Sequence, residues 1–194
     1  MNVEDAAQAS DPAKLRLSRD RLFEFQGEGS PIEGTLAVDY YEKVDDHLWN
    51  GDARAAIVVE VDPVVVAAYS DELDCVVMLG FPDVLHEAFN FEPGLQLLAV
   101  NLYRSLKHGL AVDLVPGPRD SKLWGNFVPI IGEFFSEDWD RIEKCKSKIK
   151  DDEWQRCWDL ASAYVEARPG VWRDGLPRAA QIPVAQTRKS FKLD

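Results

Sequence analysis

Residues 55–82 read AAIVVEVDPVVVAAYSDELDCVVMLGFP, and we expect them to form the centre of the fold. Two runs rich in β-branched residues flank an acidic segment, and continuous runs of this kind favour strands that are buried on both faces. The runs predict three strands, at residues 55–61, 64–69 and 75–81. A turn over residues 70–74 would join the second and third strands into a hairpin.

A helix is the alternative for part of this stretch. Asp62 followed by Pro63 is a helix-start pattern, because Asp caps the first turn and Pro suits the first helical position. The three consecutive valines at residues 64–66 favour a strand, because β-branched side chains lose rotamer freedom in a helix. We therefore predict the hairpin, with a helix within residues 63–74 as the alternative.

The rest of the chain is predicted to be largely helical. Apolar residues recur at helical spacing in four segments, at residues 35–49, 95–107, 136–149 and 151–167. A short helix is also expected after Pro82, and a fourth strand at residues 110–115. The aromatic segment at residues 119–135 is expected to pack as short helical turns, because Pro129 and Gly132 interrupt a longer helix.

These elements predict an α+β or α/β fold. A small central sheet, mixed and mostly antiparallel, would be covered by an N-terminal helix and a helical C-terminal half. The length of 194 residues suits one domain with a sizeable core. We expect a flexible N-terminal segment at residues 1–17, one globular domain at residues 18–170 and an irregular tail at residues 171–194.

The charge of the chain is strongly negative and uneven. The formal net charge is −12; residues 1–97 hold 6 Lys and Arg against 20 Asp and Glu, whereas residues 98–194 hold 16 against 14. Nucleic acids and anionic membranes bind through Lys and Arg, so an acidic half disfavours both as partners. The charge is compatible with a protein partner that presents a basic surface, or with a divalent cation.

The cysteines indicate a reducing environment, and the N-terminal sequence does not resemble a signal peptide. Cys75, Cys145 and Cys157 are odd in number and have no CxxC spacing, which is typical of free thiols. The first residues are acidic and polar, without the apolar core that a signal peptide needs. No run approaches the roughly 18 apolar residues of a membrane span. We therefore expect a cytoplasmic protein.

The acidic segment between the predicted strands is the first candidate site. Four of its acids are candidate metal ligands: Glu60, Asp62, Asp71 and Asp74. Hard cations take several carboxylate oxygens, and carboxylates that lie close together shift one another's pKa values. A metal-assisted hydrolase is therefore one alternative function, with a divalent cation as its cofactor. The segment lacks the alternating acids and the glycine of an EF-hand loop.

A second candidate site is the loop at residues 113–121, which follows the predicted fourth strand. It combines an acid, a base and a hydroxyl group in Asp113, Arg119 and Ser121. Loops at strand ends bind ligands in many α/β proteins. With a single glycine, however, this loop matches neither a Walker A loop nor a dinucleotide fingerprint. Small-molecule binding by this loop is the second alternative function.

The tryptophans form a third set of candidates. The spacing of Trp139, Trp154 and Trp158 favours positions in the core. Trp172 and Arg173, in the predicted tail, are instead expected at the surface or at a subunit contact. Trp and Arg are favoured at protein interfaces, so these two residues are the candidate interaction residues.

No motif in the chain fixes a chemistry. The three histidines, His47, His86 and His108, are far apart and lack zinc-site spacing. There is no Gly-x-Ser-x-Gly nucleophile motif. The sequence therefore favours a non-catalytic protein-interaction function, as an adaptor, an inhibitor of a basic protein or a chaperone-like partner, with an acidic face in the N-terminal half. Whether the protein is an enzyme stays open at this point.

Overall fold

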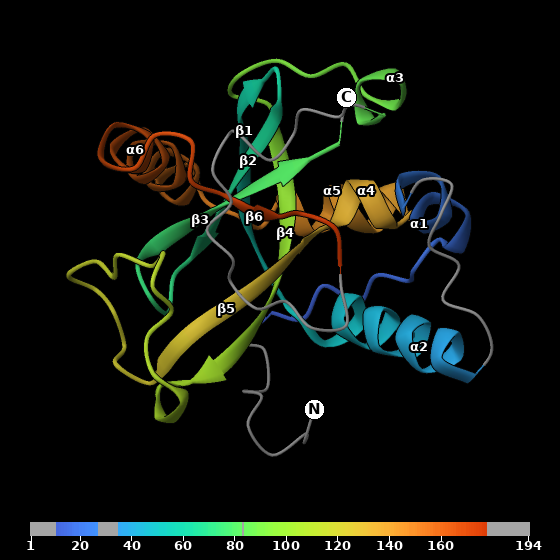
Figure 1. Cartoon of the computed structure of the whole chain (residues 1–194), viewed down its shortest axis with the longest axis horizontal. Helices are drawn as coiled ribbons and strands as arrows, with labels where there is room; N and C mark the ends of the chain where they lie inside the picture. The colour runs from blue at the N-terminus through green and yellow to red at the C-terminus, as the bar shows by residue number, and fades with distance from the viewer. Residues whose placement is uncertain (1–10, 27–34, 83, 178–194) are drawn as a thin grey trace.

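The computed structural model describes residues 11–26, 35–82 and 84–177 (Figure 1). In this part of the chain six strands form one sheet: β1 (Asp52–Val61), β2 (Val64–Ser70), β3 (Cys75–Phe81), β4 (Gln96–Ser105), β5 (Trp124–Ile131) and β6 (Arg173–Asp174). Their spatial order is β5-β4-β1-β2-β3-β6; the β3–β6 pair is parallel and the other pairs are antiparallel. With helices packed against this mixed sheet, the predicted α+β class is confirmed.

The helices cover the two faces of the sheet unequally. They are α1 (Arg19–Gln26), α2 (Thr35–Asn50), α3 (Leu85–Ala88), α4 (Gly132–Phe135), α5 (Trp139–Lys146) and α6 (Asp151–Ala167), with a 3-10 turn η2 (Leu106–His108). α6 lies across one face, where it packs on β1, β2 and β3, while α2, α4 and α5 pack on the other (Figure 1). Among the described residues, no helix is both long enough and apolar enough to span a membrane.

Residues 55–82 form the centre of the sheet. β1, β2 and β3 are an antiparallel meander, with Ala56 opposite Ala68 and Ala68 opposite Val77. β2 and β3 are buried along their whole length, which explains why both runs are apolar almost throughout. The hairpin prediction is therefore confirmed, and residues 63–74 do not contain the alternative helix.

Residues 96–105 form strand β4, so the helix predicted over residues 95–107 is wrong. β4 lies between β1 and β5 and is covered on both faces, so neighbouring side chains such as Leu97 and Leu98 are both buried. A strand of this kind is apolar at consecutive positions, and leucines can then fall at helical spacing without forming a helix.

Strand β5 occupies the aromatic segment at residues 119–135, where short helical turns were expected. Pro129 is tolerated because β5 lies at the edge of the sheet, where a missing amide donor leaves no partner strand unpaired. Gly132 then begins α4, so only the end of the segment is helical.

Residues 110–115 do not form the predicted fourth strand. They belong to the loop at residues 109–123, between η2 and β5. The Leu106 amide donates to the Leu123 carbonyl at 3.0 Å, which brings the two ends of this loop together. Val112 is exposed, so an apolar side chain that suggested a buried strand points to solvent instead.

Parts of both predicted terminal segments belong to the fold. Ala13 and Leu15 are fully buried, in contrast to the flexible segment expected there. Residues 171–177 contribute β6 to the sheet, where an irregular tail was expected. The expectations for residues 1–10 and 178–194 lie outside the described residues.

Candidate functional site

The four acids predicted to bind a metal lie at two different ends of the sheet. Glu60 and Asp62 are at the β1–β2 connection, whereas Asp71 and Asp74 are in the β2–β3 turn. β2 has seven residues, so at about 3.3 Å per residue its ends lie roughly 20 Å apart. The four acids therefore do not form one site. The described residues contain no group of three or more His, Cys, Asp or Glu side chains placed to hold a metal ion.

Asp74 is completely buried and is bound by two arginines. Arg119, from the 109–123 loop, donates through Nε (3.2 Å) and Nη2 (3.0 Å), and Arg156, from α6, donates through Nε (3.1 Å) and Nη2 (2.8 Å). Burial alone would raise the pKa of Asp74, but the hydrogen bonds from Arg156 and Arg119 outweigh it and lower the pKa to about 2. The Asp74 carboxylate thus links the β2–β3 turn to the 109–123 loop and to α6.

The 109–123 loop approaches this turn closely at Gly117. A Cβ atom at position 117 would lie only 2.3 Å from Asp74 Oδ2, so the approach requires glycine. The Gly117 amide donates to the Leu73 carbonyl at 3.1 Å, and the Ser121 amide donates to the Glu72 carbonyl at 2.8 Å. The Pro-Gly-Pro segment therefore holds the loop against the turn.

Asp71 also has an arginine partner. Arg54 Nη2 lies 2.7 Å from Asp71 Oδ2 and 2.6 Å from Asp52 Oδ2. The Tyr103 hydroxyl donates to Asp71 Oδ1 at 3.4 Å, and burial raises the pKa of Tyr103, which keeps this hydroxyl protonated. Both aspartates of the turn are therefore neutralised by arginines that come from other elements.

The loop candidates Asp113, Arg119 and Ser121 do not converge on one site. Asp113 is buried and accepts hydrogen bonds from Nε (2.7 Å) and Nη2 (2.9 Å) of Arg173. Arg119 binds Asp74 instead, and Ser121 is exposed. The acid and the base of the predicted ligand site each belong to a different ion pair that stabilises the fold.

Trp172 and Arg173 are buried, so the prediction that they lie at the surface is wrong. They are 4% and 6% exposed. Arg173 also donates to the Phe127 carbonyl at 2.7 Å. A Cβ atom at Gly80 would lie 2.3 Å from Trp172 Cδ1, so the tryptophan ring occupies the space that this glycine leaves open. Both residues connect β6 to the sheet.

Burial shifts the pKa values of the thiols and of one histidine away from neutral pH. It raises the pKa of Cys75 to about 12 and raises the pKa of Cys157, so both thiols stay protonated. It lowers the pKa of His47 to about 4, and the neutral ring places Nε2 2.9 Å from the Val100 carbonyl oxygen. None of these three groups is activated as a nucleophile or as a general base at pH 7.

Two hollows lie on opposite flanks of α6. The first, which we call the Trp158 groove, has a volume of about 380 Å³ and lies between α6, β1 and residues 93–96; Asp151 is in its wall. The second, which we call the Arg168 cavity, has a volume of about 220 Å³ and lies between α6, β3 and the 109–123 loop. The first has polar side chains in its wall, whereas the second is mainly apolar.

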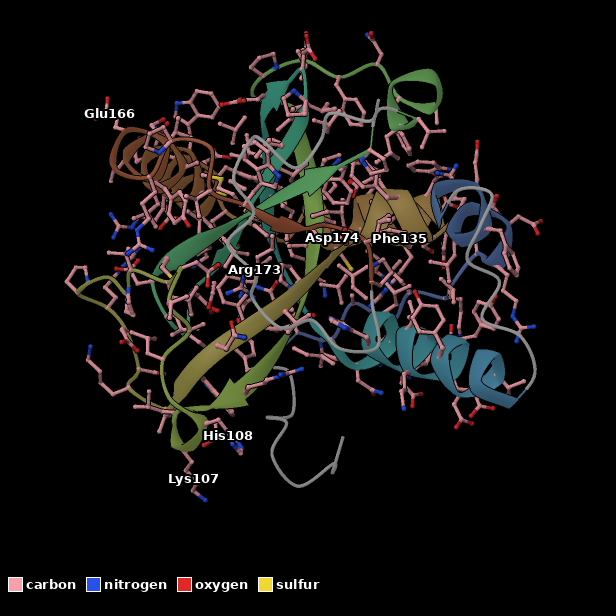
Figure 2. All side chains as sticks on the ribbon, viewed as in Figure 1. Lys107, His108, Phe135, Glu166, Arg173 and Asp174 are labelled. Carbon is pink, nitrogen blue, oxygen red and sulfur yellow. The ribbon has the colours of Figure 1, made fainter. Side chains whose placement is uncertain are left out.

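The outer face of α6 carries charge of one sign. Its exposed charged side chains are Asp151, Asp152, Asp159 and Glu166. Glu166 points away from the sheet (Figure 2). The basic residue of this helix, Arg156, shares the single charge of Asp74 with Arg119, which interacts electrostatically with Asp152, so the two arginines offset only part of this acidic charge. The acidic face expected for the N-terminal half thus has a counterpart in the C-terminal half that the charge count did not indicate.

Trp158 lies at the edge of this acidic face, on the flank of α6 that it shares with Asp151. It is 37% exposed and lines the groove, so the prediction that it is in the core is wrong, as it is for Trp139. Trp154 is buried as predicted. Spacing from Asp151 does not indicate the difference, because both tryptophans, at three and seven residues after it, lie on the same side of the helix.

Comparison with protein families, curated proteins and solved structures finds no match for this chain. Function is therefore inferred from its own residues. Asp71 and Asp74 of the β2–β3 turn have arginine partners, and Glu72 accepts a hydrogen bond from Trp124 Nε1, whereas the exposed acids of α6 form no salt bridge with a described residue. This difference separates the acids that build the fold from those that are open to a ligand.

Proposed function

We propose that the protein is a non-catalytic binding protein whose α6 docks a basic segment of a partner protein. The observation that carries this proposal is the exposed surface of α6, with four exposed carboxylates, one exposed tryptophan at its edge, and a single basic residue, Arg156, that is held on Asp74. Exposed charges of one sign attract partners of the opposite sign and steer their approach. A partner with a basic surface fits this face best.

The Trp158 groove supplies the chemistry to recognise a Lys or Arg side chain. Asp151 and Trp158 are two helical turns apart, so both face the groove. A cation on the face of an indole ring gains about 0.5–2 kcal/mol, and a nearby carboxylate adds charge-assisted hydrogen bonds. Arginine suits the groove better than lysine, because its planar guanidinium group both stacks on rings and binds carboxylates through two N–H groups.

The other charged groups support binding rather than catalysis. Asp74 and Asp113 are held by arginines that fix the 109–123 loop, so these acids belong to the scaffold. The buried thiol of Cys75 has a raised pKa and is a poor nucleophile. A scaffold that already fixes its docking helix loses little conformational entropy when a partner binds.

Labelled peptides of equal length test this function: one rich in arginine, one rich in glutamate and one neutral, with binding measured by fluorescence anisotropy. We expect the arginine peptide to bind, with an affinity that falls as salt is added, because exposed charges are screened by salt. Trp158→Ala should weaken this binding about tenfold, or ~1.4 kcal/mol, by removing the cation–π contact.

Trp139→Ala is the matched control. Trp139 is also an exposed tryptophan, but it belongs to α5 and does not line the groove. This variant should bind the arginine peptide as the wild type does. Equal binding of the three peptides, or equal effects of the two tryptophan substitutions, would contradict the proposed function.

A further inference from the structure

The Arg168 cavity lies on the flank of α6 opposite to the Trp158 groove. It is half enclosed, and its volume is about 220 Å³. Its apolar walls include Val76 of β3, Val115 of the loop, and Leu160, Ala163 and Ala167 of α6. An apolar cavity of about 150 Å³ in another protein binds benzene. The Arg168 cavity therefore has room for a small ring or a short hydrocarbon chain.

Arg168 gives this cavity a cationic wall. Its Nη1 donates to the Val112 carbonyl at 2.9 Å, and its guanidinium carbon lies 5.8 Å from the centre of the Tyr164 ring. Arg156 and Arg173 bind carboxylates, but Arg168 forms no salt bridge with a described residue. Because a guanidinium group has five N–H donors in a fork that matches a carboxylate, Arg168 retains donors for an anionic ligand.

Cys75 lines the same cavity but does not react there. Burial raises its pKa to about 12, so the side chain is a neutral thiol. A buried thiol packs like a small apolar group. The cavity therefore offers non-covalent binding, with apolar contact on most sides and one positive charge.

We propose that the Arg168 cavity binds a small apolar carboxylate, with the ring or chain inside the cavity and the carboxylate on the Arg168 guanidinium group. In proportion to the cavity that holds benzene, its volume admits about nine non-hydrogen atoms, which is the size of benzoate. The net charge of −12 disfavours anions over most of the surface, so the guanidinium group selects where an anion binds. A ligand this small binds with a Kd on the order of 0.1–1 mM.

Benzoate and its uncharged isostere benzamide are the probes, and a ¹H–¹⁵N NMR titration of the full chain is the measurement. We expect benzoate to shift amide signals of β3 and of the C-terminal half of α6. Benzoate should bind about tenfold more tightly than benzamide, because only the carboxylate forms charge-assisted hydrogen bonds. The same spectra report whether each variant is folded.

Two substitutions separate the apolar and the charged contributions. Ala163→Leu should abolish binding of both probes by filling the cavity; Ala163 is exposed on the helix, so the change leaves the core intact. Arg168→Gln should remove the preference for benzoate while benzamide still binds. Ser162→Leu is the matched control, because it introduces the same side chain at the preceding exposed position of α6, outside the cavity, and this variant should bind benzoate normally.

Three results would overturn the proposal: no binding of benzoate, equal binding of benzoate and benzamide, or benzoate binding that survives both Ala163→Leu and Arg168→Gln. None of them depends on the arginine peptide. The Trp158→Ala test concerns the other flank of α6, so the docking face and the cavity succeed or fail separately.

Discussion

The β2–β3 turn and the outer face of α6 are both rich in aspartate, but their carboxylates have different surroundings. In the turn, Asp74 is buried between two arginines and has a lowered pKa. On α6, Asp151 and Asp159 are exposed and form no salt bridge with a described residue. Three of the four residues at 71–74 and the first three residues of α6 are acids, so a local run of acids does not indicate their role. What distinguishes Asp74 from the exposed acids of α6 is that Asp74 has arginine partners.

Asp74→Asn should have the largest effect on stability. It removes the charge that two arginines share while keeping the side-chain shape, and Asn tolerates the φ of 48° at this position. Asp74 is buried but both arginines reach solvent, so the loss should be about 2–3 kcal/mol of unfolding free energy. Urea unfolding measures this loss. Asp152→Asn on α6 is the control, with an expected change within about 0.5 kcal/mol; similar losses in the two variants would remove the contrast between the regions.

The pH dependence of Asp74 sharpens the same contrast. Its pKa is about 2 in the folded protein and 3.8 ordinarily, so its stabilisation is present above pH 4 and is lost as the pH falls towards 2. The shift corresponds to about 2 kcal/mol. Asp74→Asn should therefore lose less stability than the wild type between pH 4 and pH 2, as measured by urea unfolding at each pH. If the unfolding free energies of the two proteins fell in parallel between pH 4 and pH 2, the arginines would not be stabilising the ionised Asp74 carboxylate.

His47 is a buried group whose ring is hydrogen-bonded to the backbone and forms no salt bridge with a described residue. Burial lowers its pKa from 6.5 to about 4, so the unfolded chain takes up this proton before the folded protein does. Its contribution is fully present above pH 6.5 and falls by about 3 kcal/mol as the pH drops to 4. His47→Gln retains a donor for the Val100 carbonyl and should lose this slope.

The effect of His47 has to be measured against a variant, because Glu133, which is buried, and Glu153, which is partly buried, act in the opposite direction. Burial raises the pKa values of Glu133 and Glu153, so the folded protein binds their protons first and gains stability as the pH falls. These contributions are common to both proteins and cancel in the difference. Identical slopes of unfolding free energy for wild type and His47→Gln between pH 6.5 and 4.5 would refute the role of the buried ring.

The centre of the fold could be predicted from the sequence because its strands are apolar on both faces and rich in β-branched residues. β2 and β3 begin at the predicted residues and end within one residue of the prediction. Burial on both faces also explains why the helix predicted for residues 95–107 is wrong. β4 is also covered on both faces, and its leucines at helical spacing do not distinguish a buried strand from a helix.

The partners of the acids could not be predicted from local patterns because they are distant in the sequence. Asp74 binds Arg119 and Arg156, which lie 45 and 82 positions away. No spacing rule links residues so far apart, so the turn resembled a free acidic cluster. Trp172 was misplaced for the same reason: its ring fits over Gly80, in a strand that the tail reaches only after the chain has folded.

Substitutions on α6 should have the smallest effect on stability and a clear effect on binding. Asp151→Asn combined with Asp159→Asn removes two exposed charges that hold no other element in place. The unfolding free energy should change within about 0.5 kcal/mol. The affinity for the arginine peptide should fall, and its dependence on salt should become shallower, because fewer charges contribute to the attraction.

Asp39→Asn combined with Asp46→Asn, at exposed positions of α2, makes the same change in net charge on a different helix. If both double variants weaken the peptide equally, the attraction comes from the net charge of the chain and α6 is not a docking face. If only the α6 pair weakens it, the position of the acids beside Trp158 matters more than their number. Anisotropy titrations at two salt concentrations distinguish these outcomes, since a loss of overall charge alters the salt slope of both variants alike.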